Sequence, residues 1–244
     1  MSGHSKWANI RHKKAAQDAK RGKVFTKVIK ELMVAARNNG SDPDANPRLR
    51  QAISTAKASN MPNDTMNRAI QKGAGELEGV TYEETIYEGY GPGGVAIMMD
   101  VMTDNKNRTV AEIRHIMNKY GGNLGENGSV AWMFEKFGQV TLSANGHAED
   151  KVFEEALEAG ADDFAASNNE FILTAVPSET VNVADTMSAK GYDVVSSAVE
   201  MVPKNIMNVS GDDVKKLINM MEILEDHDDI QNIYSNFEID ESDL

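Results

Sequence analysis

Hydrophobic and polar positions follow one period before residue 80 and another after it. From about residue 15 to residue 39, apolar residues recur every three or four positions, which predicts an amphipathic helix that stops at Gly40. Asn46–Pro47 and Pro62–Asn63–Asp64 have the composition of helix starts, so two further helices are expected. Because residues 1–14 show no sustained period, residues 1–80 are predicted to form an arm followed by a small helical domain.

After residue 80 the pattern becomes mixed. Tyr82–Tyr90 and Val95–Thr103 have the composition of strands and flank a Gly–Pro turn, which predicts a hairpin. A helix is expected next, because Thr109 and Glu112 have the spacing of a capping box. Residues 129–134 predict the strand that follows. The predicted order of this piece is therefore ββαβ.

A complete unit of its own is predicted over 136–203. Its expected strands are 138–143, 162–167, 171–176 and 193–202, with helices at 148–159 and 178–190. This βαββαβ order is typical of the ferredoxin-like arrangement. A helix at 211–224 and a last strand carrying Ile233, Phe237 and Ile239 would complete the earlier piece. The prediction is an α+β protein of three domains: residues 1–80, a discontinuous ferredoxin-like domain of 81–135 plus 204–244, and an inserted ferredoxin-like domain of 136–203.

Composition narrows the class of protein. The 244 residues contain no cysteine, which excludes disulfides, cysteine-ligated zinc, iron–sulfur clusters and thiol catalysis. No apolar run approaches the length of a membrane span, and no apolar segment follows the basic N-terminus as in a secretory signal. With a mean hydropathy of −0.45, the expectation is a cytoplasmic protein without a membrane partner.

The distribution of charge is more informative than the net charge of −13. Residues 1–80 hold 15 basic and 7 acidic residues, a net +8, whereas residues 81–244 sum to −21. This asymmetry indicates a polyanion-binding module attached to an acidic body; a merely solvated basic face is the alternative. On a helical wheel, the side opposite the apolar stripe of the first helix collects Lys20, Lys23, Lys27, Lys30 and Arg37.

Motifs for other chemistry are weak. The GYGPGG run matches G-x-G-x-x-G, but a strand pattern follows it instead of a helix, which favours a turn. His227 lies in an acidic run that could attract a divalent cation, although a solvated helix end explains the run more simply. No nucleophile elbow or distinct carboxylate pair is present, so neither an enzyme nor a cofactor, metal or small-molecule substrate is predicted. Lys106 and Arg108 precede a predicted helix and are candidates for a secondary phosphate contact.

The basic N-terminal region predicts binding to nucleic acid. Its cations would neutralise phosphates, while Trp7 and His12 could stack on unpaired bases, which favours RNA or single strands. No helix shows the residue spacing that reads base edges. The predicted nucleic-acid-binding residues are Lys6, Trp7, Arg11, His12, Lys13, Lys14, Lys20, Arg21, Lys23, Lys27 and Lys30.

Six motifs resemble the YebC family, which includes a mitochondrial translational activator of cytochrome c oxidase. They are GHSKWANI (3–10), RHKKAAQDAKRGK (11–23), DPDANPRLR (42–50), YEGYGPGG (87–94), DNKNRTVAEIRH (104–115) and GGNLGENGSV (121–130). The resemblance implies three domains and a cytoplasmic, non-enzymatic regulator of gene expression. Members of this family are described either as DNA-binding transcriptional regulators or as translation factors that relieve ribosome stalling at proline-rich stretches.

Between these targets, the residues favour structured RNA, because the arm offers charge and stacking without a reader of base edges. The resemblance implies that this RNA is ribosomal RNA. A transcriptional regulator that contacts promoter DNA through the same basic face is the main alternative. A protein-interaction adaptor that uses the acidic domains, or an enzyme whose site is assembled from distant residues, also stays open.

Overall fold

The computed structural model describes residues 17–167 and 169–239, and their side chains from residue 22 onward. The chain divides into two compact units. One unit is residues 132–206, and the other joins the described residues before 132 to those after 206. The three-domain limits predicted above are finer than this division and stay a prediction.

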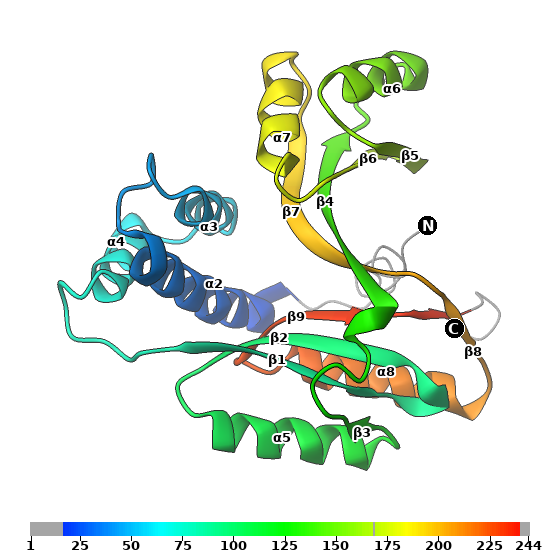
Figure 1. Cartoon of the computed structure of the whole chain (residues 1–244). Helices are drawn as coiled ribbons and strands as arrows, with labels where there is room; N and C mark the ends of the chain where they lie inside the picture. Colours follow the sequence, from blue (N-terminus) through cyan, green and yellow to red (C-terminus); the bar gives the residue numbers. More distant parts are fainter. Residues whose placement is uncertain (1–16, 168, 240–244) are drawn as a thin grey trace. The chain divides into compact units, whose positions relative to one another are not determined.

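Among the described residues, the larger unit begins with three helices: α2 (Gln17–Asn39), α3 (Pro47–Ala58) and α4 (Asn63–Gly73) (Figure 1). All three occupy predicted positions. The side chain of Asn46 caps α3 by accepting a hydrogen bond from the Leu49 amide at 3.0 Å, as its place before a proline suggested. Their shared core includes Leu32, Leu49 and Ala56, which are completely buried.

A four-stranded antiparallel sheet follows in the same unit. It contains β1 (Glu83–Tyr90), β2 (Ala96–Thr103), β3 (Asn123–Leu124) and β9 (Ile230–Ser235), in the order β3-β1-β2-β9. Helices α5 (Lys106–Lys119) and α8 (Asp212–Glu225) both lie against this sheet (Figure 1). The predicted hairpin is confirmed, and its turn contains Pro92 and a Gly93 with a φ of 71°.

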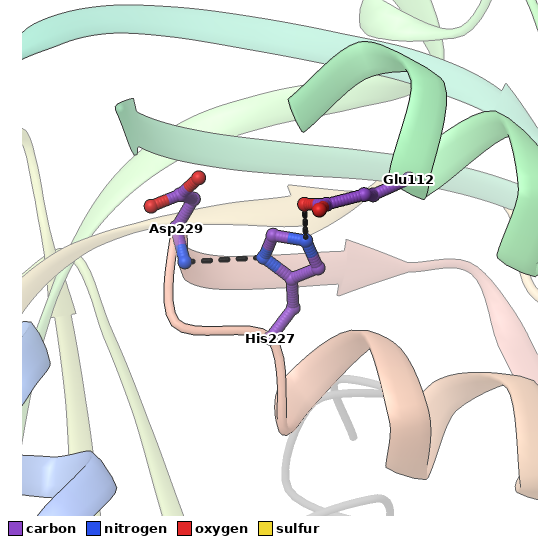
Figure 2. A group of neighbouring side chains, drawn as sticks. All are labelled: Glu112, His227 and Asp229. Atoms are coloured by element: carbon purple, nitrogen blue, oxygen red, sulfur yellow. Dashed lines mark hydrogen bonds and ion pairs between the residues drawn. The ribbon is translucent and has the colours of Figure 1, made fainter. Parts of the chain in front are cut away.

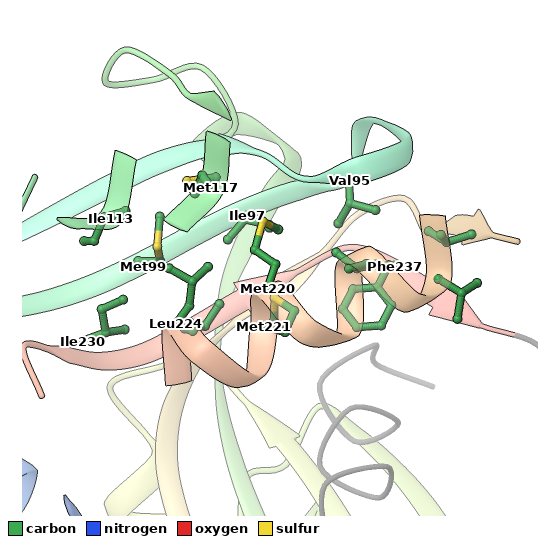
Figure 3. Packing of buried hydrophobic residues seen from close by; sticks show 14 of the residues in the cluster. Val95, Ile97, Met99, Ile113, Met117, Met220, Met221, Leu224, Ile230 and Phe237 are labelled. Carbon is green, nitrogen blue, oxygen red and sulfur yellow. The ribbon is translucent and has the colours of Figure 1, made fainter. Parts of the chain in front are cut away.

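The core of this sheet comes from alternate positions of β2. Ile97, Met99 and Val101 lie on one side of the strand and belong to the core that it shares with the two helices. Figure 3 shows Ile97 and Met99 in this core. Two short parallel strands, β8 (Met207–Val209) and β10 (Phe237–Ile239), extend the same core. Helices α5 and α8 contribute the following residues to this core: Ile113, Met117, Val214, Leu217, Met220, Met221 and Leu224.

The predicted order of this part, ββαβ completed by a helix and a strand, is the observed order, and two helices cover an antiparallel sheet. The ferredoxin-like name given to this part does not fit that order. A βαββαβ order needs a helix after its first strand. Here β1 and β2 are joined by a short turn and pair directly along their length, so the observed order is ββαβ followed by αβ.

Two local predictions are corrected in this unit. Residues 129–134 do not form a strand of this sheet: Ala131–Met133 is a short 3₁₀ helix, and β3 supplies the strand instead. The N-cap of α5 is Asn105, whose side chain accepts a hydrogen bond from the Arg108 amide at 3.1 Å, and not Thr109. Thr109 is instead buried within the helix.

The smaller unit has the predicted βαββαβ order. Its elements are β4 (Phe134–Ser143), α6 (Glu149–Glu158), β5 (Asp163–Ser167), β6 (Glu170–Ala175), α7 (Thr180–Ala189) and β7 (Val194–Pro203). The antiparallel sheet has the strand order β5-β6-β4-β7. Its separate core includes Val140, Leu173, Val183 and Met187. None of the helices in the described part of the chain combines the length and apolar character that crossing a bilayer requires.

Candidate functional site

The basic face of α2 meets the turn between α8 and β9 inside the larger unit. We name residues 225–229, with the sequence EDHDD, the acidic turn. Lys23 forms an ion pair with the Asp226 carboxylate at 2.9 Å, and the Lys27 ammonium donates to the Glu225 carbonyl at 2.8 Å. Because positions four apart lie on one side of a helix, both lysines reach the same turn.

Lys30 continues this face into the interior. Its side chain is only 5% exposed, and its ammonium forms an ion pair with the equally buried Asp229 carboxylate. It also donates to the Asp228 carbonyl at 2.9 Å and to the Met102 carbonyl at 3.4 Å. The expectation that Lys30 lies on a free basic face is therefore wrong, because these buried oxygens surround its charge.

Asp229 is the centre of this cluster. Its second carboxylate oxygen accepts hydrogen bonds from the Thr109 hydroxyl at 2.6 Å and from the Arg108 guanidinium at 2.8 Å. Burial alone would raise the pKa of Asp229, but hydrogen bonds from Lys30, Thr109 and Arg108 favour the charged form and hold the pKa well below its usual value. Asp229 is thus a buried anion at neutral pH.

The two candidates for a secondary phosphate contact are already paired with carboxylates. The Arg108 guanidinium donates hydrogen bonds to Asp229 and to Asp104, both at 2.8 Å, and these bonds raise the pKa of Arg108 above its usual value. Lys106 forms an ion pair with Glu83 at 2.6 Å on the surface. A phosphate at this helix start would have to compete with these acids.

His227 joins the acidic turn to α5 (Figure 2). Its Nδ1 accepts the Asp229 amide at 3.1 Å, and its Nε2 lies 3.0 Å from a Glu112 carboxylate oxygen. Although the three residues could offer ligand atoms within 4.8 Å of one another, the Asp229 carboxylate points away from the ring in Figure 2. Bonds within the chain therefore account for all three groups.

A cavity of about 910 Å³ lies beside this cluster. Cationic Lys23 and Arg108 and anionic Asp104 and Asp226 all line it. Because its lining contains both cationic and anionic side chains, the cavity indicates neither an anionic nor a cationic ligand.

The remaining predicted contacts lie outside what the structure describes. This applies to the whole of Lys6, Trp7, Arg11, His12, Lys13 and Lys14, and to the side chains of Lys20 and Arg21. Arg37, on the predicted basic face, is exposed near the end of α2.

Sequence reasoning identified the lysines but missed their partner. Asp229 lies 199 residues from Lys30 in the chain, so no periodicity could connect them. The one available signal was the acidic run itself, whose charge complements the basic face of α2.

Family models match both parts of the chain. The model for the TACO1/YebC N-terminal domain matches residues 5–76, and the model for the TACO1/YebC second and third domain matches residues 82–237. The crystal structure of a conserved hypothetical protein from Aquifex aeolicus is also similar. It has a TM-score of 0.85 and 43% identity, covering 93% of this chain and 94% of the other.

Curated relatives match over nearly the full length. A probable transcriptional regulatory protein from Desulfotalea psychrophila is 53% identical, over 99% of this chain and 97% of its own. A second, from Geobacter sulfurreducens, is 52% identical, over 98% of this chain and 96% of its own. Their names agree with the expectation of a regulator in place of an enzyme. By both its family-model matches and these relatives, the chain belongs to the TACO1/YebC family.

Proposed function

We propose that this protein is a non-enzymatic regulator of gene expression that docks on the phosphate backbone of a nucleic acid through its N-terminal basic region. The observation that carries the proposal is the net +8 of residues 1–80 beside the −21 of the remainder. A cationic segment gains affinity for polyanions by releasing their counterions, while an acidic body disfavours contact elsewhere. The names of the relatives support a regulatory role.

The pairing of Lys30, Lys106 and Arg108 with acids supports a smaller proposed contact set. The contact set is the arm together with Lys20 and Arg21, and it extends to Lys23 and Lys27. Lys30 holds the helix in place from inside the protein, and Lys106 and Arg108 contribute only where a phosphate displaces their carboxylates.

RNA is the class of target that the residues favour, and the resemblance to the family implies ribosomal RNA. Trp7 and His12 beside the arm cations suit stacking on unpaired bases, which duplex DNA does not offer. In this proposal the protein acts in the cytoplasm as a translation factor that relieves stalling at proline-rich stretches, and its acidic α/β domains serve as spacer or partner surface. The relatives' names favour the alternative, a transcriptional regulator that contacts promoter DNA through the same face.

The test compares two fourfold variants for binding to ribosomes and to duplex DNA over a series of salt concentrations. The first changes Lys13, Lys14, Lys20 and Arg21 to Ala. The control changes the four lysines of residues 132–206 to Ala: Lys136, Lys151, Lys190 and Lys204. A plot of log binding constant against log salt concentration has a negative slope. We expect the first variant to make this slope less steep by about 0.7–0.9 for each lost phosphate contact, and the control to retain the wild-type slope.

Equal slopes for the two variants would place the contact elsewhere and contradict the proposal. Ribosome association with weak, sequence-independent DNA binding supports the translational role. A defined operator bound about 10³-fold more tightly than random duplex would support the transcriptional alternative.

A further inference from the structure

We propose that the acidic turn is a built-in competitor for nucleic acid: it occupies Lys23 and Lys27 until a phosphate backbone displaces it. This inference rests on the proposed function, because it concerns regulation of the same basic face. The turn supplies oxygen atoms where phosphate oxygens would bind. The Asp226 carboxylate and the Glu225 carbonyl lie at 2.9 and 2.8 Å from the two ammonium groups.

The contact becomes more buried along the helix. At its outer end, the side chains of Lys23 and Asp226 are 41% and 62% exposed. At its inner end, those of Lys30 and Asp229 are 5% and 6% exposed. An exposed pair is weak and screened by salt, whereas separating a buried pair leaves charges without partners in the interior. The turn can therefore release its outer end while its inner end stays attached.

A phosphate polymer has an advantage over the turn at this outer end. Asp226 offers one carboxylate, while a nucleic acid offers a row of phosphates that engage Lys23 together with the cations of the arm. A single small anion lacks these additional contacts. Competition by the turn therefore weakens all binding slightly and favours extended polyanions over isolated anions.

A purely structural role for the ion pair predicts a different outcome. If the pair only joins α2 to the turn, its loss leaves affinity unchanged or lowers it by loosening the helix. If the turn competes with phosphate, its loss must raise affinity. The sign of the change in affinity separates the two roles.

The experiment compares Asp226→Asn with Glu222→Gln, which removes the same charge from an exposed position of α8. Glu222 forms no ion pair among the residues that the structure describes. The probes are a fluorescently labelled, mixed-sequence single-stranded RNA and the same sequence as duplex DNA, titrated with the full-length protein. We expect Asp226→Asn to lower the Kd by about two- to fivefold, the value of one exposed pair, and Glu222→Gln to leave it near wild type.

A second comparison tests whether the effect passes through Lys23. In a Lys23→Gln background the competitor has lost its target, so adding Asp226→Asn should no longer lower the Kd. An equal decrease in both backgrounds would show a general charge effect and overturn the inference, as would Kd values that do not differ between Asp226→Asn and Glu222→Gln. A wild-type protein that binds neither probe would overturn the proposed function and this inference together. If the wild type binds and Asp226→Asn binds no more tightly, only this inference falls.

Discussion

At the scale of single residues, Asp229 connects two helices of the candidate site. It is 4% exposed and receives Lys30 from the helical region and Arg108 and Thr109 from α5. A buried charge is tolerated only when its partners replace the water it has lost. Asp229 therefore links α2 and α5 to the start of β9, and its substitution should affect the stability of the whole larger unit.

Changing Asp229 to Asn should lower the free energy of unfolding by about 3–5 kcal/mol, because Lys30 stays buried without its anion. Urea unfolding followed by circular dichroism measures this. The matched control is Asp228→Asn, an exposed neighbour in the same turn, for which we expect a change within about 0.5 kcal/mol. Equal effects of the two changes would show that the Asp229 cluster contributes little to stability.

The same residue predicts how stability depends on pH. The pKa of Asp229 is lower in the folded than in the unfolded protein, so the unfolded chain binds this proton more readily. The stabilisation is complete above the unfolded carboxyl pKa of about 4 and is lost as pH falls from there toward the depressed folded pKa. Unfolding measured between neutral and acid pH should show a steeper loss for wild type than for Asp229→Asn, and parallel curves would contradict the assignment.

At the scale of elements, Glu88 explains why one predicted strand is absent. Its carboxylate, 6% exposed on β1, accepts the amides of Gly128, Val130 and Ala131 at 2.7–2.8 Å. Burial alone would raise the pKa of Glu88, but these backbone hydrogen bonds lower it below the usual value. Three amides of the segment 128–131 are thus satisfied by this side chain, and the fourth, of Ser129, donates to the Glu126 carbonyl at 3.1 Å. The segment therefore does not need a neighbouring strand to satisfy its amides.

Replacing Glu88 with Ala leaves these three amides without their acceptor, two of them on partly or fully buried residues. We expect a loss of about 2–4 kcal/mol in unfolding free energy and faster hydrogen exchange at Gly128, Val130 and Ala131. Glu88→Gln keeps one acceptor oxygen and should lose less. The control is Glu84→Ala, an exposed position of the same strand that pairs with Arg48. Unchanged exchange rates at the three amides in Glu88→Ala would rule out this role.

Local signals account for most of the predicted elements. Periodicity, helix caps and turns, each read from neighbouring residues, predict helices α2, α3 and α8, the β1–β2 hairpin and the elements of 134–203. Elements that depend on distant partners were not predictable. Strands β3 and β8 span two and three residues and exist because β1 and β10 lie beside them. The candidate site divides in the same way. The lysine face of α2 follows from the local helical period, whereas the contact of Asp229 with Lys30 joins residues 199 positions apart.

At the scale of the whole molecule, residues 132–206 have the properties of an insertion. Their two ends pair with each other: Phe134 lies opposite Pro203, and the Lys204 amide donates to the Met133 carbonyl at 2.8 Å. This unit has its own core, while the residues on either side of it share another. A segment whose ends are adjacent can be removed without stretching the chain that continues beyond it.

The inserted unit also holds much of the acidic charge. It contains 13 acidic and four basic residues, a net −9, so the rest of the chain carries −4. If nucleic acid binds through the N-terminal basic region, this unit contributes repulsion of phosphate and not attraction. Its removal should therefore raise affinity if the protein still folds.

Replacing residues 132–206 with a short Gly–Ser linker tests both statements. Because the core of β2, α5 and α8 contains no residue from 132–206, we expect cooperative unfolding with a Tm within a few degrees of the corresponding wild-type transition. RNA binding should persist and become tighter at low salt, with the difference from wild type shrinking as salt screens the repulsion. Residues 132–206 produced alone serve as the control and should fold without binding RNA. A linker variant that folds but no longer binds would show that the acidic unit carries part of the contact surface, which a basic region acting alone does not allow.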